Sequence, residues 1–120
     1  MQTILVIDDD ESLRDTIGVM LEQEGFRAVL VADGRSGYEK AMLLKPDLIL
    51  VDLRLPGMSG AELQDKLIAE GRRIPMIFLT AVSDEVLRAR VLKWGALCVL
   101  PKPFDEEILI EYLEEAIKES

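Results

Sequence analysis

The 120-residue chain is expected to form one α/β domain, residues 1–120, with a parallel five-stranded sheet between two layers of helices. Two observations predict this class. Short runs of branched apolar residues alternate with longer segments whose apolar residues recur at helical spacing. The run at residues 48–51 is apolar throughout, which suits a strand buried on both faces of a sheet. Right-handed crossovers then favour a (βα)5 three-layer sandwich with strand order 2-1-3-4-5.

Polar residues follow several of the expected strands, which span residues 3–7, 27–32, 48–51, 75–80 and 97–100. Three acids follow the first strand, Asp52 follows the third, and Lys102 lies just beyond the fifth. Parallel strands end at the same edge of a sheet, and binding crevices in such folds lie beyond the carboxyl ends. The sequence therefore places its candidate site at this edge.

Capping residues mark where the expected helices begin and end. The expected N-caps are Asp10, Ser59, Ser83 and Asp105. Glu62 completes a capping box with Ser59. The second helix is expected over residues 35–44, after a turn at Asp33 and Gly34. The expected terminators are Gly25, Pro46, Gly71 and Gly95.

Composition excludes several classes of function. The net charge of −9 would repel a phosphodiester backbone, so we expect no direct binding to nucleic acid. The chain has no histidine, which excludes a His-based triad and a phosphohistidine carrier. Its one cysteine, Cys98, lies in an apolar run and is expected in the core. No apolar run approaches a membrane span and no signal peptide is present, so a cytoplasmic domain is expected.

The acids at the strand ends predict a metal site. Asp8 and Asp9 follow the first strand, and Asp52 ends the third, which the expected order makes its neighbour. Two carboxylates about 4 Å apart repel by about 4 kcal/mol at an effective dielectric of ~20, so such a cluster needs protons or a cation. Mg²⁺ suits these oxygen ligands. The alternative, a helix cap in a solvated loop, is favoured for Asp10 but not for Asp9 with Asp52.

Thr80 and Lys102 would complete a ring around these acids. Thr80 ends the fourth strand, and Lys102 supplies a cation of the kind that often binds phosphate. A metal, a nucleophilic carboxylate, a hydroxyl and an ammonium group are the parts needed to form an aspartyl phosphate. The sequence therefore predicts phosphoryl transfer to Asp52.

These residues stand in an order that resembles the receiver domain of two-component response regulators, over essentially the whole chain. The matching segments are Asp8-Asp9, Asp52 with residues 53–60 behind it, Thr80-Ala81, Gly95-Ala96 and Lys102-Pro103-Phe104. The resemblance implies a flavodoxin-like fold and a phosphorelay switch with Asp52 as phospho-acceptor. The implied donor is a sensor histidine kinase or a phosphotransfer protein. Self-phosphotransfer and autodephosphorylation are implied, without turnover of a separate substrate.

The resemblance also implies roles for individual residues. Asp8, Asp9, Asp52 and the backbone carbonyl of Arg54 would hold Mg²⁺. Lys102 and Thr80 would contact the phosphoryl group, and the Lys102–Pro103 peptide bond would be cis. Val99 departs from the pattern, because many receivers have an aromatic residue there whose ring moves on activation. The position of Arg54 tunes phosphoryl lifetime in the family, in a direction that sequence does not give.

Three rival functions differ in the residues that they require. A haloacid-dehalogenase-type phosphatase needs a second acid two residues after the nucleophile, where this chain has Arg54. A flavodoxin-like FMN carrier needs a phosphate loop after the first strand, where three acids would repel phosphate. A receiver-like interaction module that is never phosphorylated stays open.

Two surfaces are candidates for contacts with partners. Basic residues on the fourth helix and acidic residues on the fifth would suit a homodimer through the fourth helix, fifth strand and fifth helix. These residues are Arg88, Arg90 and Lys93, and Glu111, Glu114 and Glu115. Gly18 shares a helical stripe with Arg14 and Glu22 that is expected to face outward and to contact the kinase. The alternative for both surfaces is ordinary exposure to solvent.

Overall fold

Over residues 1–81 and 83–118, which the computed structural model describes, five strands alternate with five helices. The elements are β1 Thr3–Ile7, α1 Glu11–Gln23, β2 Arg27–Val31, α2 Gly34–Leu44, β3 Leu48–Asp52, α3 Gly60–Ala69, β4 Met76–Thr80, α4 Glu85–Lys93, β5 Cys98–Pro101 and α5 Glu106–Lys118. All strand pairs are parallel, and the sheet has the order β2-β1-β3-β4-β5. The predicted fold class and strand order are therefore confirmed.

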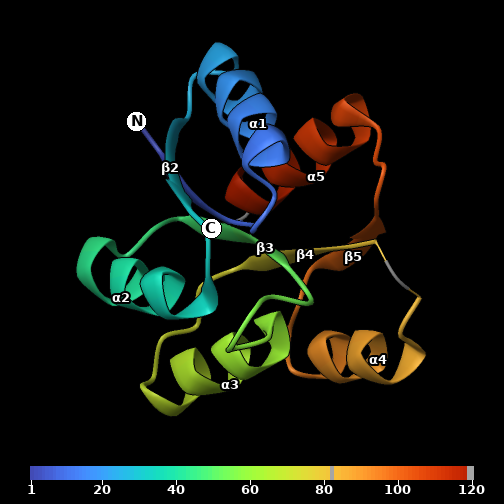
Figure 1. Cartoon of the computed structure of the whole chain (residues 1–120). Helices are drawn as coiled ribbons and strands as arrows, with labels where there is room; N and C mark the ends of the chain where they lie inside the picture. Colours follow the sequence, from blue (N-terminus) through green and yellow to red (C-terminus); the bar gives the residue numbers. More distant parts are fainter. Residues whose placement is uncertain (82, 119–120) are drawn as a thin grey trace.

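The sheet separates two apolar cores. Helices α1 and α5 cover one face, and α2, α3 and α4 cover the other (Figure 1). Residues alternate between the two sides along each central strand, so that Ile4 and Val6 belong to the first core and Leu5 and Ile7 to the second. Every residue of β3 is buried, as the continuous apolar run predicts.

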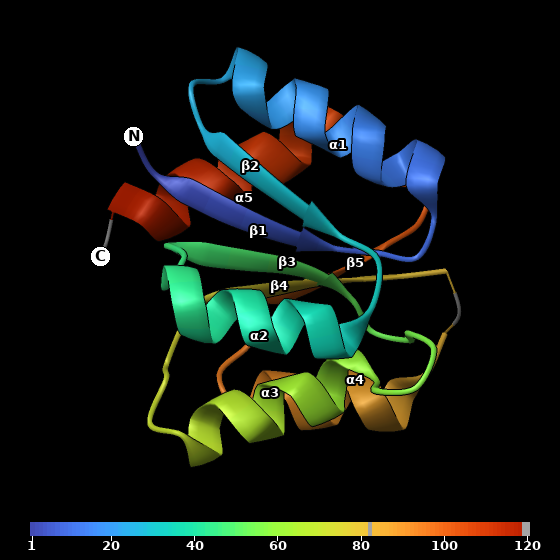
Figure 2. The same ribbon diagram turned by 60° about the vertical axis from the view of Figure 1, so that its left-hand side comes forward.

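The two edges of the sheet differ in what they carry. Figure 2 shows the N-terminus and the last turn of α5 at the amino edge, and the loops that follow the strands at the opposite, carboxyl edge. The loop with Pro56 and Gly57 lies at the carboxyl edge, and Gly57 has a φ of +78°, a backbone conformation that favours glycine. No described helix combines the length and the apolar character that a membrane span requires.

Several predicted boundaries differ from the structure by one residue. Asp84, not Ser83, is the N-cap of α4, because its side chain accepts a hydrogen bond from Leu87 N–H three residues later. Strand β5 runs over Cys98–Pro101 rather than 97–100, and Leu97 is exposed. The predicted caps Asp10 and Ser59 are confirmed.

The prediction that Gly18 faces outward is wrong. Gly18 is buried on α1, and a Cβ at this position would lie 3.0 Å from Cδ1 of Leu30. Strand β2 packs beside α1 and covers this part of the helix surface. Arg14, on the same stripe, is half-buried and donates a hydrogen bond from Nη1 to the backbone carbonyl of Asp8 at 2.8 Å. This stripe is therefore partly structural.

Candidate functional site

Strands β1 and β3 bring three carboxylates together at the carboxyl edge. Ile7 pairs with Val51 in the ladder, so the residues that follow them emerge side by side. One carboxylate oxygen from each of Asp8, Asp9 and Asp52 lies within 4.8 Å of the others. Asp8 and Asp52 are buried, whereas Asp9 is exposed. The predicted acid cluster is therefore present.

Lys102 supplies the cation that faces this cluster. Its Nζ atom lies 2.7 Å from Oδ2 of Asp8 and 2.7 Å from Oδ2 of Asp52. Burial alone would lower the pKa of Lys102, but its interactions with Asp52 and then Asp8 raise the pKa above its ordinary value. The side chain is therefore charged at neutral pH. The peptide bond from Lys102 to Pro103 is cis, as the resemblance implies.

Backbone groups hold the two buried carboxylates in place. Oδ1 of Asp8 accepts a hydrogen bond from Asp10 N–H at 2.9 Å, and Oδ1 of Asp52 accepts one from Arg54 N–H at 2.9 Å. Oδ2 of Asp8 is buried and has Lys102 as its charge partner, but no well-aligned hydrogen-bond donor among the described residues. Oδ2 of Asp8 thus depends on Lys102 to balance its charge.

These residues fit a hard divalent cation. Three carboxylates face one ammonium group, so the cluster carries an excess of negative charge. The donor atoms of the three carboxylates are all oxygen, which Mg²⁺ prefers. Asp8, Asp9 and Asp52 could therefore hold a metal ion. The role of the Arg54 carbonyl stays a prediction.

Thr80 and Val99 lie on the neighbouring strands. Thr80 ends β4 and pairs with Pro101, and its carbonyl accepts a hydrogen bond from Lys102 N–H at 2.8 Å. Thr80, Val99 and Lys102 line a hollow of about 280 Å³ beside the acid cluster. Val99 is half-buried and packs against the core under α4. The predicted hydroxyl and ammonium groups thus border one hollow.

An ion pair that sequence reasoning missed lies at the edge of this site. The guanidinium group of Arg54 pairs with Asp84, the N-cap of α4. The hydrogen bond from Leu87 N–H, together with Arg54, lowers the pKa of the Asp84 carboxyl, although desolvation acts in the opposite direction. The sequence does show that the loops after the adjacent strands β3 and β4 carry opposite charges. It does not show that the two side chains point toward each other.

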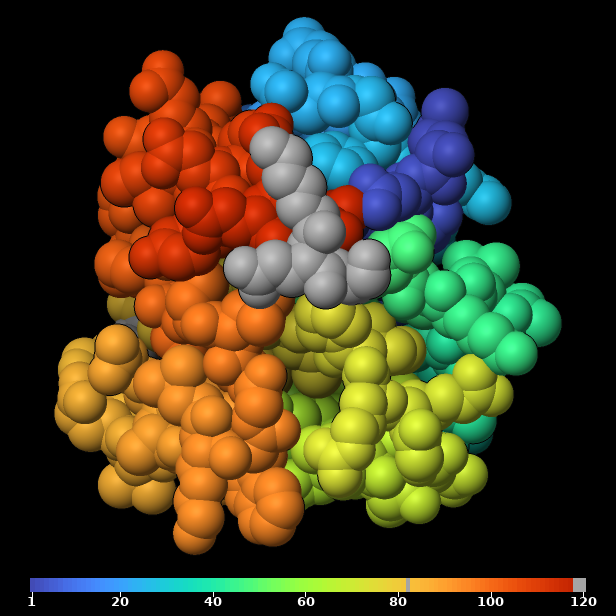
Figure 3. All heavy atoms as spheres, turned by 180° about the vertical axis from the view of Figure 1, so that it is seen from behind, coloured from blue at the N-terminus to red at the C-terminus, as the bar shows by residue number. Residues whose placement is uncertain are grey.

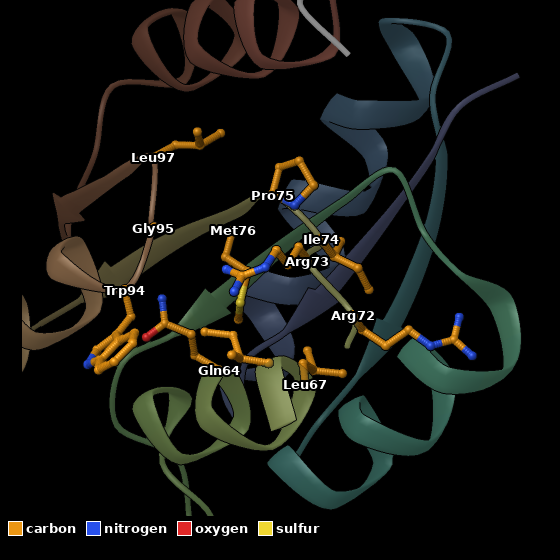
Figure 4. A pocket seen from close by; sticks show the side chains of 11 residues that line it. Gln64, Leu67, Arg72, Arg73, Ile74, Pro75, Met76, Trp94, Gly95 and Leu97 are labelled. Carbon is orange, nitrogen blue, oxygen red and sulfur yellow. The ribbon is translucent and has the colours of Figure 1, made fainter. Parts of the chain in front are cut away.

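Another hollow lies at the amino edge, away from the carboxylates. Figure 3 shows it between the orange α4–β5 segment and the yellow α3–β4 segment. Its lining includes Leu67, Arg73, Met76 and Trp94, and Figure 4 shows the Gln64 amide directed toward Trp94. Gln64 Nε2 donates to the Val91 carbonyl at 3.0 Å, which ties α3 to the C-terminal end of α4.

The fold and the carboxyl-edge site together define an α/β domain with three clustered carboxylates and a facing lysine at the carboxyl edge of its parallel sheet. A family model for the response regulator receiver domain matches residues 4–114, and the chain belongs to this family. Members of the family are switches of two-component signalling that interact with histidine kinases or phosphotransfer proteins. The family assignment predicted from the motifs is therefore confirmed.

Individual relatives support the same assignment. The chain is 38% identical over 109 residues to the DNA-binding response regulator MtrA of Mycobacterium tuberculosis (strain ATCC 25618 / H37Rv), covering 91% of this chain and 47% of MtrA. It is 32% identical over 117 residues to the transcriptional regulatory protein FixJ of Bradyrhizobium diazoefficiens, covering 98% and 57%. The Francisella response regulator 1452 receiver domain superposes with a TM-score of 0.92 at 26% identity, covering 99% and 98%. The chain spans about half the length of these curated relatives.

Proposed function

We propose that Asp52 accepts a phosphoryl group in a Mg²⁺-dependent reaction and that the domain relays this event as a conformational change. The observation that carries the proposal is the position of Lys102, whose Nζ atom lies 2.7 Å from oxygens of both Asp8 and Asp52. An ammonium group beside a nucleophilic carboxylate offsets the charge of an incoming phosphoryl group. Membership of the receiver family supports the same conclusion.

In the proposed step, a carboxylate oxygen of Asp52 attacks the phosphorus of a phosphohistidine on the partner. The new P–O bond forms as the P–N bond breaks, and the departing imidazole keeps the electron pair of that bond and takes up a proton from water. Lys102 pairs with one phosphoryl oxygen, and the Thr80 hydroxyl donates a hydrogen bond to another. Water later cleaves the acyl phosphate and restores Asp52. No separate substrate is turned over.

The proposed role of Mg²⁺ is to balance negative charge at the site. Asp8, Asp9, Asp52 and the Arg54 carbonyl would hold Mg²⁺, which would balance negative charge on the phosphoryl oxygens. The acid cluster supports the three carboxylate ligands, and family resemblance supports the carbonyl. Asp9 is the exposed member of the cluster, so it can bind the ion without losing a buried contact.

Intact-mass spectrometry after incubation with acetyl phosphate and Mg²⁺ tests the proposal. The unmodified chain should gain the mass of one phosphoryl group, and EDTA should prevent the gain. Asp52→Asn should gain nothing. Asp47→Asn is a matched control, because Asp47 lies at the amino edge and accepts a hydrogen bond from Thr3 N–H. An unmodified chain that gains no mass would favour the unphosphorylated interaction module instead.

We also propose a setting for the domain. A histidine kinase would phosphorylate it in the cytoplasm, and its net charge of −9 would disfavour direct binding to nucleic acid. A homodimer through α4, β5 and α5 stays a proposal. Arg90 is less available for that contact than its sequence position suggests, because it pairs with Asp65 of α3. Crosslinking with and without a phosphoryl mimic tests the dimer. An equal dimer content under the two conditions would contradict the proposal.

A further inference from the structure

Arg54 connects the acid cluster to the start of α4. Its backbone N–H donates to Oδ1 of Asp52 at 2.9 Å, and its guanidinium group pairs with Asp84. The side chain of Asp84 is 17% exposed, whereas that of Arg54 is 55% exposed and can move. A single residue therefore contacts the proposed phospho-acceptor through its backbone and the N-cap of α4 through its side chain.

The first turn of α4 depends on Asp84. One oxygen of this carboxylate accepts a hydrogen bond from Leu87 N–H at 3.0 Å, and the other pairs with Arg54. Val91 is the one residue of α4 that is buried, and it lies in the second half of the helix. That half is also tied to α3 through Arg90 and the carbonyl of Val91. The described contacts thus fix the end of α4 more firmly than its beginning.

Phosphorylation would change the charge balance beside Arg54. A divalent cation, if bound, would together with Lys102 balance the charges of Asp8, Asp9 and Asp52. An acyl phosphate at Asp52 carries two negative charges in place of one, which leaves the site with surplus negative charge. A guanidinium group binds phosphoryl oxygens through paired, charge-assisted hydrogen bonds. Arg54, two residues along the chain, is the exposed arginine that already contacts Asp52.

We propose that Asp84 and the phosphoryl group on Asp52 compete for the side chain of Arg54. In the resting domain, Arg54 ties the loop after β3 to the N-cap of α4. In the phosphorylated domain, it turns to the phosphoryl oxygens and leaves Asp84 as a cap without its ion-pair partner. The first turn of α4 then loosens, which carries the signal to that helix. This inference rests on the proposed function.

Binding of beryllofluoride, which mimics a phosphoryl group on a carboxylate, tests the competition in the presence of saturating Mg²⁺. Fluorine NMR gives the dissociation constant directly. Asp84→Asn keeps an oxygen for Leu87 N–H but removes the charge, so it should tighten binding about two- to five-fold, the range of a partly exposed ion pair. Arg54→Gln should weaken binding. The variant with both changes should match Arg54→Gln, because Asp84 acts through Arg54.

Hydrogen exchange gives a second test. If Asp84 were only a structural cap, beryllofluoride would not change the exchange rates in the first turn of α4. In the unmodified chain, beryllofluoride should speed exchange of the Leu87 amide and its neighbours in the first turn of α4. In Arg54→Gln that exchange should already be fast, and the mimic should add nothing. Arg90→Gln is the matched control, since it breaks another ion pair of α4 and should leave beryllofluoride binding unchanged.

The outcomes separate this inference from the proposed function. If Asp84→Asn shifts binding equally with and without Arg54, or if exchange in α4 does not respond to bound mimic, the competition is overturned while phosphorylation stands. If the unmodified chain neither binds beryllofluoride nor takes up a phosphoryl group from acetyl phosphate, the proposed function and this inference are both overturned.

Discussion

Nζ of Lys102 lies 2.7 Å from Oδ2 of Asp52, although the two residues are 50 positions apart in the chain. The ladder explains the meeting: β3 pairs with β4, β4 pairs with β5, and all three end at the same edge. The same ammonium group lies 2.7 Å from Asp8, which follows β1. Folding thus gathers charges from both ends and the middle of the chain.

Removal of the Lys102 charge should destabilise the domain. Lys102→Met would leave two largely buried carboxylates without their cation, and we expect a loss of about 2 kcal/mol, between the values for exposed and buried ion pairs. Urea denaturation measures this change. Adding Asp52→Asn should recover much of the loss, because it removes one of the repelling charges. Lys40→Met, at an exposed position, serves as control, and an equal effect there would contradict the role of Lys102.

Magnesium should stabilise the folded chain. An ion that binds only the folded acid cluster adds about 1.4 kcal/mol of stability at ten times its dissociation constant. The melting temperature should therefore rise with MgCl₂ and not with NaCl at matched ionic strength. Asp9→Asn should abolish the rise, because it removes one of the three carboxylates that would hold the ion. Asp9 is the exposed member of the cluster, so the change should not disturb the core. A rise that persists in Asp9→Asn would place the ion elsewhere.

Gly60 should not tolerate a side chain. A Cβ there would lie 2.5 Å from the carbonyl oxygen of Asp52, which is backbone and cannot yield without moving the end of β3. Gly60→Ala should cost about 1–3 kcal/mol, as overpacked sites do, and should reduce phosphoryl uptake. Gly18→Ala is the matched comparison. Its Cβ would meet only the flexible end of the Leu30 side chain, and alanine has a helix propensity about 1 kcal/mol more favourable than that of glycine. Equal costs in denaturation would refute the contrast.

The Cys98 thiol should be unreactive in the folded domain. Burial raises the pKa of Cys98 from 9.0 to about 11, so the thiolate fraction at neutral pH falls about 100-fold. The unfolded chain deprotonates first, so this thiol stabilises the fold below pH 9.0 and its contribution is lost as pH rises toward about 11. Alkylation rates with and without urea check this. A native thiol that reacts as fast as the unfolded one would disprove the burial argument.

The sequence was sufficient for the fold and the acid cluster because both follow from position along strands. Apolar runs and caps located the strands to within a residue, and parallel order then brought Asp8, Asp9, Asp52 and Lys102 to one edge. No ligand geometry was required for that inference. Family motifs supplied the cis bond before Pro103, which strand patterns alone would not indicate.

Side-chain partners across different elements were the part that sequence did not reveal. Helical spacing correctly grouped Arg14 and Gly18 on one stripe, but it gave no sign that β2 would cover Gly18. It also gave no sign that Arg90 would turn to Asp65 or that Arg54 would reach Asp84. Each of these contacts depends on the relative placement of two elements, which a periodic pattern in one element cannot specify.

Chemical trapping of the acyl phosphate tests the central claim most directly. The chain would be phosphorylated with acetyl phosphate and Mg²⁺, reduced with borohydride, and mapped by peptide mass spectrometry. We predict that the reduced residue is found at position 52 and that it is absent when Mg²⁺ is omitted. A reduced residue at Asp8 or Asp9, or none in a folded chain with Mg²⁺ present, would contradict the account.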